Sequence, residues 1–89
     1  MTAQHEVKYP VTIALKVVMH SKEEAGKNVA DLMEILKKIG IPLRGAVSEN
    51  KSSAGKYTSY TVPVYIETKE KMHALYKALK AHPDVKFAI

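Results

Sequence analysis

The chain has 89 residues, of which 46% are hydrophobic, and its 14 basic against 9 acidic residues give a formal net charge of +5. This length fits one domain with a modest core, and the lack of cysteine excludes disulfides, a thiolate metal site and a cysteine nucleophile. There is no apolar run of about 18 residues that would predict a membrane span, and no signal peptide is recognisable, so we expect a cytoplasmic protein.

The N-terminal part of the chain predicts a tail and a first strand. Residues 1–8 are polar and unpatterned, so we expect a flexible tail ahead of a single domain at residues 9–89. From Val11 to His20, apolar and polar residues alternate, which is typical of a strand with one buried face. The opposite face of this strand then carries Lys16.

A helix is predicted to follow this strand. Ser21 and Glu24 have the spacing of a capping box, and apolar residues recur at helical spacing from Ala25 to Ile39. Gly26, near the start, favours a beginning a few residues later. Gly40 is the expected end of the helix, because glycine readily takes the left-handed conformation that closes one.

Two further strands are predicted after this helix. Residues 43–48 read as a weak second strand, residues 50–56 as a loop, and residues 57–67 as a third strand with strict alternation. Pro63 falls inside this third strand, where proline removes a hydrogen bond of the ladder. We therefore expect either a bulge at Pro63 or a neighbouring strand that ends before reaching it.

The C-terminal part predicts a second helix and a last strand. Thr68 can cap a helix with an apolar face, and Pro83 stops it. Residues 85–89 then alternate, with Val85, Phe87 and Ile89 on the apolar side and with Lys86 and Ala88 opposite.

The order of elements, β-α-β-β-α-β, predicts the fold class. Each helix has one apolar face and each strand one apolar side, so the economical arrangement packs both helices on one face of the sheet. We predict an α+β ferredoxin-like sandwich, with a four-stranded antiparallel sheet and two helices on one face.

Gly55-Lys56 resembles the end of a phosphate-binding loop. Such a loop needs another glycine five residues earlier, a hydroxyl residue after the lysine, and a following helix. Asn50 and Tyr57 occupy the two positions, and a strand follows. We therefore interpret this segment as a hairpin loop, with Gly55 at positive φ.

Catalytic and metal-binding patterns are absent from the sequence. The four histidines, His5, His20, His73 and His82, have no ligand spacing, and we expect His73 and His82 on or beside an exposed helix face. The neighbouring carboxylates on the helices are expected to form solvated ion pairs with lysines. We expect no enzyme activity, no metal and no cofactor.

The predicted sheet leaves one face uncovered. Its expected members are basic and aromatic residues, with small or apolar residues between them: Lys16, Arg44, Tyr57, Tyr65 and Lys86, with Ala14, Val18, Ala46, Pro63 and Ala88. Three interpretations stay open for this face: contact with a protein partner or a second subunit, binding of RNA or single-stranded nucleic acid, and an ordinary solvated surface.

Three segments carry a family resemblance. The stretch YPVTIALKVV from Tyr9, SSAGKYTSYTVPVYIET from Ser52 and LYKALKAHPDVKFAI from Leu75 are similar to the YbeD family of small bacterial proteins. The resemblance implies a ferredoxin-like fold close to ACT regulatory domains. It also implies a regulatory or adaptor role, for which a link to lipoate metabolism has been suggested.

A second likeness lies in residues 25–47, which resemble the glycine, helix and second strand of an ACT domain. In ACT domains this glycine lets an amino-acid ligand approach the backbone at a subunit interface. The resemblance places Gly26 at the matching position, as a candidate ligand loop for a small-molecule effector of unknown identity.

The leading hypothesis is a regulatory or adaptor domain that acts through a protein partner or as a homodimer. We expect no binding to a membrane. The alternative is nucleic-acid binding by the basic and aromatic sheet face. Salt-sensitive affinity and loss of binding on Tyr57→Ala would distinguish the alternative.

Overall fold

A computed structural model of the protein describes residues 8–24 and 26–89. The predicted tail at residues 1–8 therefore lies almost wholly outside the described residues, as do His5 and Ala25. The elements follow the predicted order: β1 (Val11–His20), α1 (Lys27–Ile39), β2 (Ser48–Lys51), β3 (Tyr57–Ile66), α2 (Lys69–Ala81) and β4 (Val85–Ala88).

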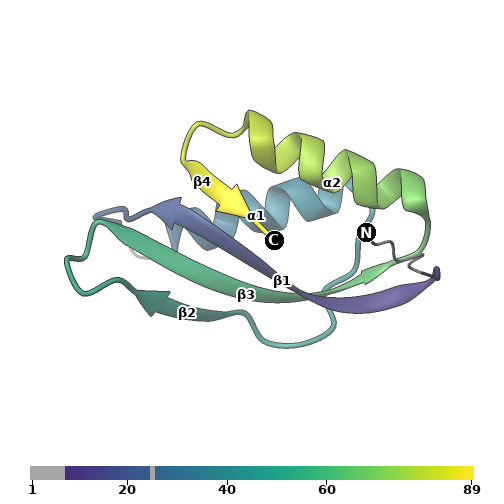
Figure 1. The fold of residues 1–89 in the computed structure, drawn as a ribbon, viewed down its shortest axis with the longest axis horizontal. Helices are drawn as coiled ribbons and strands as arrows, with labels where there is room; N and C mark the ends of the chain where they lie inside the picture. Colours follow the sequence, from purple (N-terminus) through teal and green to yellow (C-terminus); the bar gives the residue numbers. More distant parts are fainter. Residues whose placement is uncertain (1–7, 25) are drawn as a thin grey trace, which may run out of the picture.

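The strands form one four-stranded sheet in the order β2-β3-β1-β4, and all neighbouring pairs are antiparallel. Both helices lie on the same side of this sheet (Figure 1). The predicted ferredoxin-like sandwich is therefore confirmed. Within the part of the chain that is described, neither helix is long and apolar enough to cross a membrane.

The core lies between the sheet and the two helices. The long strands β1 and β3 are paired along their whole length, from Val11 opposite Ile66 to His20 opposite Tyr57. Because side chains alternate along a strand, opposite residues share a face. One face supplies the buried residues of the core, and the helices complete it: Leu15, Val17, Met19, Tyr60, Val62, Val64 and Ile66 from the strands, with Leu32, Leu36, Leu75 and Leu79.

The start of α1 differs from the predicted capping box. Gly26 is the N-cap residue, with φ 83° and no hydrogen bond from a side chain to the first turn. The hydroxyl of Ser21 instead bonds the hydroxyl of Thr58 at 2.7 Å, across to β3. Ser21 does not cap the first turn, because α1 begins only at Lys27, six residues after Ser21. The later start that Gly26 favours is thus confirmed.

The second strand also differs from its prediction. It spans Ser48–Lys51 rather than residues 43–48, and every residue in it is exposed. Within residues 43–48, Leu43 forms only a single bridge, to Val64. The strand forms later because Pro63 has no N–H to donate to this segment, in which Gly45 lies against the proline ring.

Pro63 shows how a proline fits a central strand. The carbonyl of Pro63 accepts a hydrogen bond of 2.8 Å from the Arg44 N–H, so the backbone of this residue faces away from β1. β2 pairs only as far as Ser48 opposite Thr61, before it would need a donor from Pro63. Gly45 covers the ring, since a Cβ at this position would lie 3.1 Å from Pro63 Cγ. Of the two expected solutions, the shortened neighbour is observed.

The loop between β2 and β3 is a hairpin turn, as predicted. Gly55 has φ 74°, and its N–H donates to the carbonyl of Ser52 at 2.9 Å. Ser52 also closes the loop, because its N–H donates to the Tyr57 carbonyl at 2.8 Å. A strand follows, so no helix terminus is present to hold a phosphate.

The last strand corrects the predicted division of its two faces. The register between β1 and β4 shifts between Val18 and Met19, which adds one residue to β4 at Lys86. Ala88 therefore pairs with Val17 and packs on the core, whereas Phe87 pairs with Val18 on the open face. The expectation that Phe87 points inward and Ala88 outward was wrong, because the bulge exchanges the faces.

Candidate functional site

The face of the sheet away from the helices is the first candidate site. Four of the five residues predicted for it project from strands or from the β4 bulge, namely Lys16, Tyr57, Tyr65 and Lys86, and Arg44 reaches it from the segment beside β3. Ala14, Val18 and Pro63 also lie on this face, while Ala46 is exposed outside the strands.

Arg44 and Tyr65 form one cluster at the end of β3. The Arg44 guanidinium carbon lies 4.5 Å from the centre of the Tyr65 ring. A guanidinium at this distance over an aromatic face is held by cation–π attraction. The backbone of Arg44 is fixed as well, by its hydrogen bond to Pro63. The N–H edge of the guanidinium is therefore held in a fixed place on an exposed surface.

Tyr57 is the centre of a second cluster, at the other end of β3. The amino groups of Lys56 and Lys86 each lie 5.6 Å from the centre of its ring. The His20 ring, from the paired position on β1, lies 5.1 Å from it at an interplanar angle of 40°. Three basic side chains thus converge on one tyrosine.

The structure adds residues that the sequence reasoning did not assign to this face. Phe87 is 50% exposed on it, and His20 and Lys56 complete the Tyr57 cluster. The alternation of β1 already placed His20 on the side of Lys16, so that signal was present in the sequence. The bulge that turns Phe87 outward has no such signal.

The open face is cationic. No strand residue that faces this side is Asp or Glu within the described chain, because Glu49 pairs with Tyr60 and so faces the helix side. The basic groups on it are Lys16, Arg44, Lys56 and Lys86, with His20 beside them. The electrostatic potential over this face is therefore positive.

A polar hollow of about 150 Å³ lies next to Gly26, at the start of α1. Its wall includes Asn28, which is 2% exposed and whose Oδ1 has no hydrogen-bond partner among the described residues. The Asn28 amide donates to the His20 carbonyl at 2.8 Å and to the Tyr60 hydroxyl at 3.2 Å. Beside Gly26 a Cβ would meet open space, so the predicted ligand loop does border a cavity.

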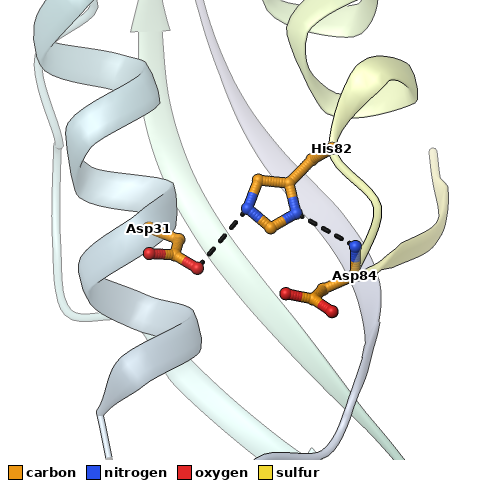
Figure 2. Close-up of side chains that lie close together, drawn as sticks. All are labelled: Asp31, His82 and Asp84. Atoms are coloured by element: carbon orange, nitrogen blue, oxygen red, sulfur yellow. Dashed lines mark hydrogen bonds and ion pairs between the residues drawn. The ribbon is translucent and has the colours of Figure 1, made fainter.

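Asp31, His82 and Asp84 form a third cluster, between α1 and the turn from α2 to β4 (Figure 2). His82 Nε2 lies 3.4 Å from Asp31 Oδ2, and the Asp84 N–H donates to His82 Nδ1 at 3.1 Å. The side chain of His82 is 19% exposed. His82 thus lies beside the end of α2, with its ring partly covered by α1, whereas His73 is exposed on α2 as expected.

These three residues offer ligand atoms within 4.8 Å of one another, but their bonds do not suit a metal. A metal on Nε2 would need the imidazole proton on Nδ1, which faces the Asp84 N–H donor. The carboxylates are paired with lysines as well: Lys27 Nζ lies 2.8 Å from Asp31, and Lys22 Nζ 2.7 Å from Asp84. The cluster instead ties α1 to the α2–β4 turn.

The lysines also shift the titration of this cluster. The hydrogen bond from Lys27 lowers the pKa of Asp31, and the hydrogen bond from Lys22 lowers the pKa of Asp84. Asp31 in turn raises the pKa of Lys27. Each carboxylate is therefore held in its charged form.

The sheet order and the two helices on one face define a small ferredoxin-like α+β domain. The model of the family described as "Protein of unknown function (DUF493)" matches residues 4–89, and the chain belongs to this family. A UPF0250 protein of Xanthomonas oryzae pv. oryzae is 31% identical over 86 residues, which cover 96% of this chain and 90% of the relative. A UPF0250 protein of Janthinobacterium sp. is 42% identical over 45 residues, about half of each chain. The resemblance to the YbeD family is thereby confirmed.

Solved structures show the same fold at low sequence identity. The solution structure of protein HP0495 from H. pylori has a TM-score of 0.73 at 17% identity, and the match covers 97% of this chain and 88% of that one. The ACT domain from GTP pyrophosphokinase of Chlorobium tepidum has a TM-score of 0.66 at 11% identity, with 90% and 96% covered. These matches establish the architecture, which many unrelated functions share.

Proposed function

We propose that this chain is a non-enzymatic regulatory or adaptor domain that binds another protein through the open face of its sheet. The observation that carries the proposal is the convergence of cations and aromatic rings on that face, with Phe87 half exposed among them. Arginine and aromatic residues are enriched where proteins bind one another. The ACT-like architecture supports the same role by analogy.

A different protein, rather than a second copy, is the better occupant of this face. Two copies joined face to face would bring the same cations together without carboxylates to neutralise them, and such like-charge contacts are unfavourable. We therefore propose a complex with a different protein.

Affinity capture with matched baits tests this function. The baits are the unaltered chain, a Tyr57→Ser, Phe87→Ser double variant, and a Lys77→Ser control on the exposed side of α2. We expect proteins that survive nuclease treatment to remain on the unaltered and control baits and to be lost from the double variant. Equal capture by all three baits would remove the open face as the contact, and loss of all captured material on nuclease treatment would favour nucleic-acid binding.

A second candidate function is binding of a small effector in the hollow beside Gly26. The Oδ1 of Asn28 favours it, because this buried acceptor has no partner among the described residues and a ligand N–H would satisfy it. The probe is each standard amino acid, added singly while the melting temperature is followed. A ligand raises that temperature by mass action. The same temperature in every amino acid would dismiss this candidate.

A further inference from the structure

We infer that the protein partner presents an acidic, extended segment, whose carboxylates bind at the two cationic clusters along β3. This inference rests on the proposed function, because it names the chemistry of the partner at the same open face. It adds two requirements that a general protein contact does not have: negative charge, and a fixed spacing between two charged points.

The Arg44–Tyr65 cluster is suited to a carboxylate. The cation–π contact with Tyr65 restrains the guanidinium, and a guanidinium presents paired N–H donors that match the two oxygens of a carboxylate. Among the described residues, Arg44 takes part in no ion pair within the chain. Its donors are thus oriented before a partner arrives, which lowers the entropy cost of binding.

The Tyr57 cluster is suited to a second carboxylate. Lys56 and Lys86 approach the same ring, and neither forms an ion pair with any carboxylate in the described part of the chain. Both ammonium groups lie 5.6 Å from the centre of one ring, so a carboxylate bound at Tyr57 would be close to two positive charges. Exposed Phe87 beside them adds apolar area for the partner chain.

The distance between the clusters sets the length of the segment. Tyr57 and Tyr65 are eight residues apart on one strand, so the clusters are separated by about 27 Å at about 3.4 Å per residue. An extended peptide has almost the same rise. Two acidic points about eight residues apart would therefore meet both clusters, and Lys16 lies between them on β1, opposite Thr61.

The aromatic rings distinguish an acidic peptide from single-stranded nucleic acid. Sequence-tolerant binding of single strands uses aromatic faces on which bases stack. Arg44 already covers a face of Tyr65, and Lys56, Lys86 and His20 crowd Tyr57. The cations remain available to carboxylates while the rings are occupied, so the arrangement favours the peptide.

Designed peptides test the inference with the isolated chain. The first probe is an extended peptide of about eleven residues with a pair of glutamates at each end, and the second has the same composition with all glutamates at one end. A glutamine version and an oligouridine of similar length complete the set. Amide chemical shifts map the binding face, and a titration at low salt gives the affinity.

We expect the first peptide to shift amides of the open face and to bind more weakly as salt rises. Arg44→Gln and Lys86→Gln should each lower its affinity by about tenfold, whereas the matched control Lys77→Gln on α2 should leave it unchanged. The second peptide, with all glutamates at one end, should bind severalfold more weakly, because its carboxylates cannot reach both clusters.

Three results would overturn the inference: equal affinity for the two glutamate peptides, equal effects of Arg44→Gln and Lys77→Gln, or tighter binding of oligouridine than of the first peptide. If no peptide binds while capture of proteins is still lost with the Tyr57→Ser, Phe87→Ser bait, the acidic segment is wrong and the proposed function stands. If capture is also independent of the bait, both fail.

Discussion

Asn28 joins three elements through one amide group. Its nitrogen donates to the end of β1 at the His20 carbonyl and to β3 at the Tyr60 hydroxyl, while the residue itself belongs to α1. Its spacing was a usable signal, because Asn28, Leu32 and Leu36 are four residues apart and so fall on one buried helical stripe. The sequence reasoning passed over it because polar residues on helices are mostly exposed.

Asn28→Asp should destabilise the fold strongly at neutral pH. The substitution keeps the shape but replaces the two donated hydrogen bonds by a buried negative charge that faces two oxygens. We expect a loss of about 3 kcal/mol or more in the free energy of unfolding, measured by urea denaturation. Ala30→Asp, on the exposed side of the same helix, is the control and should change it by about 0.5 kcal/mol at most. Similar losses in both variants would contradict the assigned role of the amide.

Gly26→Ala should cost about 1–2 kcal/mol of stability, because Gly26 has φ 83° and a left-handed conformation strains residues that carry a Cβ. Apart from the chain neighbours of Gly26, no described residue has an atom within 4 Å of the added Cβ, so crowding does not explain the loss. Gly26→Asn should lose less, since asparagine tolerates this conformation better. Urea denaturation of the two variants gives their free energies of unfolding. A larger loss for the asparagine variant would argue against backbone strain as the cause.

At the scale of elements, the long strands were predictable and the short ones were not. β1 and β3 each alternate over 10 residues, and this local pattern can be recognised without knowing which strands lie beside them. β2 is SENK, with every residue exposed, so it has no apolar pattern to find. The faces of β4 depend on the bulge opposite Val18 and Met19, which arises from pairing with β1 and not from its own four residues.

The candidate site also has a part that can be predicted from the sequence and a part that cannot. Lys16, Tyr57 and Tyr65 could be placed on the open face because strand alternation fixes the direction of their side chains. Their convergence with Lys86 and Lys56 could not be deduced, since it depends on the β4 bulge and on the hairpin loop. The His82 cluster depends on the position of α1 against the turn after α2, which no local pattern reports.

Thr68→Ala should weaken α2. The Thr68 hydroxyl accepts a hydrogen bond of 3.2 Å from the Lys71 N–H, which satisfies a donor of the first helical turn. We expect the free energy of unfolding to fall by about 1 kcal/mol, measured by urea denaturation. Thr68→Ser keeps the acceptor and should retain most of the stability. An equal loss in the serine variant would assign the effect to the lost methyl group instead of the cap.

At the scale of the whole molecule, the cations fall into two groups: those that form ion pairs with carboxylates, and those that form none among the described residues. The cations of the open face form no ion pair with the described residues, whereas Asp31 and Asp84 pair with lysines at the end of the helical layer. Ion pairs within the chain contribute modestly to its stability, and the cations that form no ion pair in the described part of the chain are open to a binding partner. The two groups should therefore respond to different tests: substitutions on the open face should change binding, and substitutions in the ion pairs should change the dependence of stability on pH.

The pH dependence of stability tests this separation. The pKa values of Asp31 and Asp84 are lowered in the folded chain by their lysine partners, so the unfolded chain binds more protons in acid. Their contribution is complete above the unfolded pKa of about 4 and is lost as the pH falls through the folded pKa values. Asp31→Asn and Asp84→Asn should each make the fall in stability between about pH 5 and pH 2 less steep, as followed by urea denaturation across that range.

Lys22→Gln should act in the same direction, because it removes the cause of the lowered pKa at Asp84. Slopes identical to that of the unaltered chain in all three variants would mean that the ion pairs contribute nothing to the fold.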